Sequence, residues 1–112
     1  MKARYVQRGE SIDFIPASDV AAGDIVKVGS LVGVAKLDIK AGELGALALC
    51  GVYEIATNGT AIEAGAVVSV DPGTGKVCAA DASGAVKFGH AVTKAEAADA
   101  TVHVRLEQGL NG

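Results

Sequence analysis

The sequence has few of the large side chains that usually fill a protein core. Its 112 residues include no tryptophan, two phenylalanines and two tyrosines, although half of them are apolar. Alanine and valine make up most of this apolar half, so the core must be thin and its backbones closely spaced. A mean hydropathy above zero with so few large side chains indicates that other subunits cover some apolar surface. We therefore expect a homo-oligomer.

Long apolar runs are also missing. No stretch approaches the roughly 20 apolar residues that a membrane-spanning helix needs, so we expect no membrane contact. Residues 1–8 lack the apolar segment of a secretory signal, and we expect the protein to stay in the cytoplasm in which it is made. Cys50 and Cys78 do not have the spacing of a zinc site or a redox pair, and we interpret them as buried, reduced thiols.

Catalytic and cofactor motifs are incomplete or absent. Residues 72–76 resemble the end of a phosphate-binding P-loop, but Val70 stands where that loop needs glycine and Val77 where it needs a hydroxyl. His90 and His103 have no second ligand type at a metal-like spacing. No nucleophile elbow and no carboxylate pair for acid-base chemistry is present. We predict that the protein is not an enzyme and has no catalytic residue, metal or cofactor.

The net charge of −3 conceals an uneven distribution. Residues 1–8 contain Lys2, Arg4 and Arg8 and no acid, whereas the remaining residues contain seven basic and thirteen acidic side chains. An acidic body repels nucleic acid, so we expect no direct nucleic-acid contact. The basic segment can dock on an acidic protein surface, or it can be a solvated terminus. We expect residues 1–10 to form an extended N-terminal arm and residues 11–112 a single β-barrel domain.

Glycine is abundant, with fifteen residues placed mostly between short β-type runs. Eight or more such runs, and one helix-favouring segment at 94–98 that is too short for more than a single turn, predict an all-β fold. We expect a compact small barrel or sandwich whose strands are joined by glycine-rich turns. The turn and hinge glycines are Gly23, Gly29, Gly33, Gly42, Gly65, Gly73 and Gly75.

Several connections and one strand can be predicted in detail. The Pro-Gly segment 71–75 predicts a hairpin between the runs 67–70 and 76–79. The Asn-Gly pair in 57–60 is typical of a type I′ hairpin turn, and residues 81–84 predict a further turn. The last run alternates, so we expect its valines and leucine to face inward and its polar residues to face solvent. The inward residues are Val102, Val104 and Leu106, and the outward residues are Thr101, His103, Arg105 and Glu107.

With these turns and runs in order, the chain resembles a family of small tailed-phage and prophage proteins that act as capsid decoration, or cement, proteins. Members are also described as a domain of unknown function or mislabelled as a phage recombinase, a label that the incomplete P-loop does not support. The matching residues are Tyr5–Gln7, Gly9, Ile12, Asp13, Gly23, Asp24, Val26, Val28, Gly29, Leu31, Gly33–Ala35, Gly42, Glu43, Gly51–Tyr53, Gly65, Val68, Asp71, Gly89, Ala91, Asp99–Val102 and Val104–Leu106.

The resemblance implies a structural protein, similar in role to the head-decoration protein of lambdoid phages. Such a protein binds the outside of an icosahedral shell where capsomers meet, and it stabilises their contacts. Its implied partners are the major capsid protein and copies of itself, with trimers expected ahead of dimers. Its implied location is the capsid exterior of the virion, after synthesis in the cytoplasm of the host bacterium. The segment expected to contact the capsid consists of Lys2, Arg4, Tyr5, Val6, Gln7 and Arg8.

Two other functional classes remain open from the sequence. One is a different phage structural or adhesion module of the tail or baseplate, which would use the same turn-and-strand pattern. The other is a lipoyl- or biotinyl-like carrier domain, in which Lys36 would be the modified lysine. Lys36 lacks the Met-Lys-Met or Asp-Lys-Ala context that such domains use.

Overall fold

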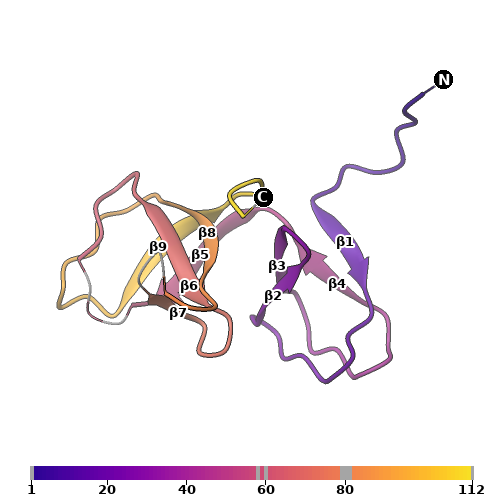
Figure 1. Ribbon diagram of the computed structural model, residues 1–112, viewed down its shortest axis with the longest axis horizontal. Coiled ribbons are helices and arrows are strands. Elements are labelled where there is room, and N and C mark those ends of the chain that lie inside the picture. Colours follow the sequence, from indigo (N-terminus) through magenta and orange to yellow (C-terminus); the bar gives the residue numbers. More distant parts are fainter. Residues whose placement is uncertain (1, 58, 60, 79–81, 112) are drawn as a thin grey trace.

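Nine short strands form in the part of the chain that the structure describes. This computed structural model describes residues 2–57, 59, 61–78 and 82–111 (Figure 1). The strands are β1 (Ser11–Phe14), β2 (Ile25–Val28), β3 (Leu31–Ala35), β4 (Gly45–Ala48), β5 (Gly51–Ala56), β6 (Val67–Asp71), β7 (Lys76–Cys78), β8 (Val86–Ala91) and β9 (Thr101–Leu106). In these described ranges, no helix is long and apolar enough to cross a membrane.

The strands form two antiparallel sheets that lie side by side along the long axis of the molecule (Figure 1). The strand order is β1-β4-β3-β2 in the four-stranded sheet and β5-β9-β8-β6-β7 in the five-stranded sheet. The predicted all-β fold of short strands is confirmed. The barrel option needs a correction, because backbone pairing closes neither sheet among the described residues. β5 and β7, the two edges of the five-stranded sheet, approach each other without forming a ladder.

The predicted hairpin at 71–75 is confirmed. β6 pairs with β7 in the register Ser69↔Cys78, Val70↔Val77 and Asp71↔Lys76. The Asp71 side chain accepts a hydrogen bond from the Gly73 N–H at 2.9 Å, and its carbonyl accepts one from the Gly75 N–H at 2.7 Å. These bonds hold the loop in its reversed path, and Gly75 supplies the positive φ of 72° that this path requires.

The inward and outward assignment of β9 is also confirmed. Val102, Val104 and Leu106 are at most 2% exposed, whereas His103 and Arg105 face solvent. β9 pairs with β5 along the full length of β5, and with β8 on its other side. It is therefore an inner strand of its sheet.

Some predicted turns fall partly outside the described residues. Asn58 and Thr60 of the predicted type I′ turn are among these, as are Ala79 at the end of the run 76–79 and Asp81 of the turn 81–84. The strand before the Asn-Gly pair, β5, pairs with β9 and not with β6, its successor in sequence. Residues 94–98 contain turns and one β-bridge from Ala95 to Ile62 instead of a helical turn.

Two buried clusters of unequal size hold the sheets together. The larger is formed mainly by the five-stranded sheet, and its centre is Phe88, which is fully buried and meets Tyr53 edge to face at 6.0 Å between ring centroids. Val32 and Val34 of β3 also belong to this cluster. The four-stranded sheet has a second cluster in which the buried residues are Ala35, Ile39 and Leu47. One strand, β3, thus contributes to both clusters.

Gln108, which follows β9, bonds to the backbone of the other sheet. Its side-chain amide donates to the carbonyl of Val32 at 2.7 Å and to that of Leu49 at 3.0 Å. Its side-chain oxygen accepts a hydrogen bond from the Val32 N–H at 2.9 Å. One side chain therefore satisfies three backbone groups of β3 and of the β4–β5 connection. We call this arrangement the Gln108 clamp.

Candidate functional site

The N-terminal arm, residues 2–10, leads into an edge strand. All its residues are exposed, and Tyr5 and Val6 are 78% and 83% exposed. The chain extends away from both sheets before it enters β1 (Figure 1). At its base, the Glu10 carbonyl accepts a hydrogen bond from the Leu49 N–H at 2.9 Å. β1 pairs on one side with β4 and lies at the edge of its sheet, so arm and edge strand form one continuous exposed backbone.

The charged and apolar groups of the arm are available to a partner. Arg8 pairs with Glu10 at 3.1 Å, and both side chains are exposed. A pair so exposed to water contributes little to stability, and Glu10 leaves the arm with a net positive charge. Tyr5 and Val6 lie between Arg4 and Arg8 in sequence. The arm therefore combines cations with an aromatic and an aliphatic side chain.

The seven predicted turn and hinge glycines occupy three kinds of position. Five of them have positive φ in turns: Gly23, Gly29, Gly42, Gly65 and Gly75. Gly73 lies in the β6–β7 turn without a positive φ. Gly33 lies inside β3 and not in a turn, and a Cβ there would lie 2.9 Å from the Leu47 Cβ. Gly33 thus permits close packing of β3 on β4.

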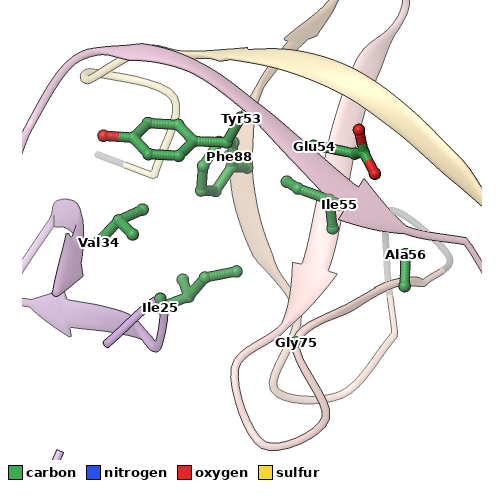
Figure 2. Close-up of a pocket in the computed structure, with 9 residues that line it drawn as sticks. Ile25, Val34, Tyr53, Glu54, Ile55, Ala56, Gly75 and Phe88 are labelled. Carbon is green, nitrogen blue, oxygen red and sulfur yellow. The ribbon is translucent and has the colours of Figure 1, made fainter. Parts of the chain in front are cut away.

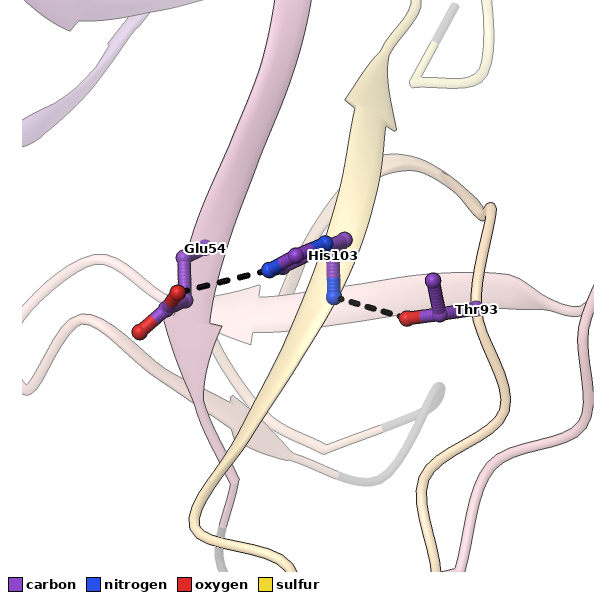
Figure 3. A network of polar contacts seen from close by, with 3 residues as sticks. All are labelled: Glu54, Thr93 and His103. Carbon is purple, nitrogen blue, oxygen red and sulfur yellow. Dashed lines mark hydrogen bonds and ion pairs between the residues drawn. The ribbon is translucent and has the colours of Figure 1, made fainter.

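The outward face of the five-stranded sheet contains two histidine–carboxylate contacts. His103 on β9 lies 3.3 Å from Glu54 on β5, between Nε2 and Oε2, and its backbone N–H donates to the Thr93 hydroxyl at 3.3 Å (Figure 3). His90 on β8 contacts the carboxylate of Glu107 through Nδ1. Sequence reasoning identified neither contact, because the partners are far apart in the chain. The strand register, once known, places Glu54 opposite His103.

A small pocket of about 170 Å³ lies where the two sheets meet (Figure 2). Ile25 and Val34 line it from the four-stranded sheet, and Tyr53, Ile55 and Phe88 line it from the five-stranded sheet. Burial raises the pKa of the Tyr53 hydroxyl, and the nearby Cys50 raises it further. The hydroxyl remains protonated and donates to the Cys50 carbonyl at 3.1 Å. The lining is mainly aliphatic and aromatic, with no arrangement of nucleophile and base.

A second hollow is lined by Asp19, Asp24 and Asp38. Each carboxylate accepts a backbone N–H, from Ala41, Ala21 and Ala22 respectively, at 2.8–3.0 Å. These aspartates therefore stabilise turns. Within the described ranges, no group of three or more metal-ligating side chains comes together.

The cysteines differ from their prediction as buried thiols. Cys50 is exposed in the connection between β4 and β5, and Cys78 is partly exposed at the end of β7. The cause is their position, since Cys50 lies between two strands and Cys78 is the last residue of the edge strand β7. Partial burial raises the pKa of the Cys78 thiol, and the Asp71 carboxylate raises it further. Lys36, the candidate carrier lysine, is exposed in a bend directly after β3.

A family model described as phage cement protein matches residues 6–106 of the chain. The match covers both sheets and begins within the arm, so Lys2, Arg4 and Tyr5 precede it. No curated protein and no solved structure matches the chain.

Proposed function

The chain belongs to the phage cement protein family, whose members have a capsid-associated structural role, and we propose on this premise that it decorates the outer surface of an icosahedral capsid. It stabilises contacts between neighbouring capsomers of the major capsid protein, and it does so as a homo-oligomer without catalytic activity. It is made in the host bacterial cytoplasm and reaches the exterior of the capsid in the virion.

The observation that carries the proposed mode of binding is the exposed arm. An extended backbone next to an open sheet edge can pair with a strand of a partner, which supplies main-chain hydrogen bonds. Lys2, Arg4 and Arg8 add attraction to an acidic surface, while Tyr5 and Val6 supply apolar contact area. Repetition over a symmetric shell multiplies many weak contacts of this kind.

Deletion of residues 2–8 tests this proposal. We expect the truncated protein to remain folded, because the arm leaves both buried clusters intact, and to lose binding to expanded capsids by at least about tenfold, which corresponds to roughly 1.4 kcal/mol. Binding is measured by cosedimentation with purified capsids, and folding by circular dichroism. Full occupancy of capsids by the truncated protein would contradict the role of the arm.

Two matched variants separate charge from apolar contact. One replaces Lys2, Arg4 and Arg8 with glutamine, and the other replaces Tyr5 and Val6 with serine. The charge variant should lose affinity most at low salt, because screening already weakens the same attraction at high salt. The apolar variant should lose affinity equally at both salt concentrations. Cosedimentation with purified tails in place of capsids would instead indicate a tail or baseplate module.

A further inference from the structure

The outward face of the five-stranded sheet contains a block of four exposed side chains on two neighbouring strands. Val52 on β5 lies opposite Arg105 on β9, and Glu54 lies opposite His103. Val52 is 57% exposed, and the side chains of Glu54 and His103 are 62% and 50% exposed. All four point away from Phe88 and the buried cluster. We call these residues the β5–β9 block.

The two ends of the Arg105 row are apolar. His90 on β8 lies opposite Arg105, and Val67 on β6 lies opposite His90, so the row reads Val67, His90, Arg105 and Val52 across four strands. Val67 and Val52 at its two ends are 47% and 57% exposed. An arginine between exposed valines is typical of the centre of a protein–protein interface.

The charges in the block leave Arg105 without a counter-ion. Glu54 contacts His103, and Glu107 contacts His90. Among the described residues, no carboxylate lies within ion-pair distance of the Arg105 guanidinium. In an acidic body, this guanidinium is exposed, and its planar donors are suited to a carboxylate from outside the chain.

The block is complementary to itself. Its opposite charges, Arg105 and Glu54, occupy one diagonal, while Val52 and His103 occupy the other. Two copies can face each other across a two-fold axis that lies in the plane of this face and runs along the diagonal through Val52 and His103. Rotation about this axis brings each Arg105 to the other copy's Glu54, and it brings each Val52 and each His103 to its own equivalent. A two-fold interface requires this kind of self-complementary patch.

We infer that the outward face of the five-stranded sheet is a contact surface between two copies of this chain, centred on the β5–β9 block. The arm extends from the other sheet, at the far end of the molecule (Figure 1), so one copy can contact a neighbour and a capsid at once. The inference specifies the homo-oligomer of the proposed function, but it does not require capsid binding. It favours a two-fold contact over the three-fold arrangement that the family resemblance implies.

The face is small. The block and the two further residues of the Arg105 row are six side chains, far fewer than the roughly 20–30 residues on one side of a standard interface. The contact is therefore weak in solution, with dissociation in the micromolar to millimolar range, and it strengthens when copies are held side by side on a shell. Detection requires sedimentation velocity over a wide range of protein concentrations.

A charge-exchange experiment with the full chain, in the absence of capsids, tests this inference. Arg105→Glu and Glu54→Arg should each lose self-association by at least about tenfold, because each places like charges together twice. An equimolar mixture of the two variants should recover it, because both contacts then join opposite charges. Lys27→Glu, a charge reversal on β2 of the other sheet, is the matched control and should associate like the unchanged protein.

Three results would overturn the inference. They are a monomeric unchanged protein at millimolar concentration, unaltered association of Arg105→Glu, and failure of the mixture to recover when both variants have the circular dichroism spectrum of the unchanged protein. If Arg105→Glu reduced capsid binding in the monomeric form, the face would belong to the capsid contact and not to a second copy. Normal association of a chain that does not bind capsids would refute the proposed function alone.

Discussion

The two sheets differ in how they form a buried core from small side chains. The five-stranded sheet builds a continuous cluster that includes Phe88, and each of its strands supplies at least one buried apolar residue. The separate cluster beside the four-stranded sheet has three buried residues, of which Ile39 lies in the connection between β3 and β4, and β3 buries Val32 and Val34 in the larger cluster. The comparison teaches that the five-stranded sheet can stabilise itself, whereas the four-stranded sheet depends on it through β3 and the Gln108 clamp.

The largest effect should come from filling Gly89 in the five-stranded sheet. A Cβ at this position would lie 1.7 Å from the Arg105 carbonyl oxygen, a backbone atom that cannot move without separating β8 from β9. Gly89→Ala should therefore destabilise the protein by at least about 4 kcal/mol or prevent folding. Thermal unfolding by circular dichroism measures this, with Lys87→Ala on the same strand as a control near zero. A melting temperature close to that of the control would show that β8 and β9 can separate at little cost in free energy.

Gly33 offers the matching change in the four-stranded sheet. A Cβ there would lie 2.9 Å from the Leu47 Cβ and 3.3 Å from the Ala48 carbonyl oxygen. Gly33→Val should cost about 1–3 kcal/mol, the range for overpacking a core, and should disturb folding or assembly. Gly33→Ala should cost less. If Gly33→Val were as damaging as Gly89→Ala, the four-stranded sheet would be as essential to the fold as its neighbour.

Removal of the Gln108 clamp should give an effect that is no larger and is more local. Gln108→Ala leaves the N–H and carbonyl of Val32 and the carbonyl of Leu49 without these partners, at a cost of about 1–3 kcal/mol. Amide hydrogen exchange should rise in β2–β4 more than in β5–β9. Gln108→Glu keeps the acceptor for the Val32 N–H but places a carboxylate oxygen against the carbonyls of Val32 and Leu49, so it should cost at least as much as Gln108→Ala. Equal exchange in both sheets would contradict this prediction and would mean that the two sheets open as one cooperative unit.

Local patterns explain why much of the fold could be predicted. Val102, Val104 and Leu106 alternate with polar residues, and alternation alone orients a strand. The Asp71–Gly75 turn brings together neighbours in sequence, so its chemistry determines the hairpin. The pairing of strands could not be predicted in this way, because no local sequence pattern links β5 with β9. The Asn-Gly pair after β5 favoured a local hairpin, but pairing with distant β9 prevailed because it buries Ile55 and Tyr53 against Phe88.

The candidate site divides in the same way. The role of the arm stays a prediction, and it rests on a local property, the three basic residues without an acid in residues 1–8. The β5–β9 block could not be predicted, because Val52 and Arg105 become neighbours only through a register that the sequence does not display. The role of Gln108 could not be predicted from the sequence, because a glutamine after a strand is ordinarily solvated. Its role follows from tertiary structure alone.

The Gln108 clamp also imposes an order of events on synthesis. Val32 and Gln108 are 76 residues apart, and a chain leaves the ribosome from its N-terminus. β1 to β4 emerge first, but the side chain that satisfies the backbone of β3 emerges after β9. Three hydrogen bonds of β3 and the β4–β5 connection can therefore form only after the rest of the chain has emerged. A nascent or truncated chain that lacks Gln108 therefore presents the arm next to a four-stranded sheet without these three bonds, so the last residues of the chain affect the sheet that carries its first.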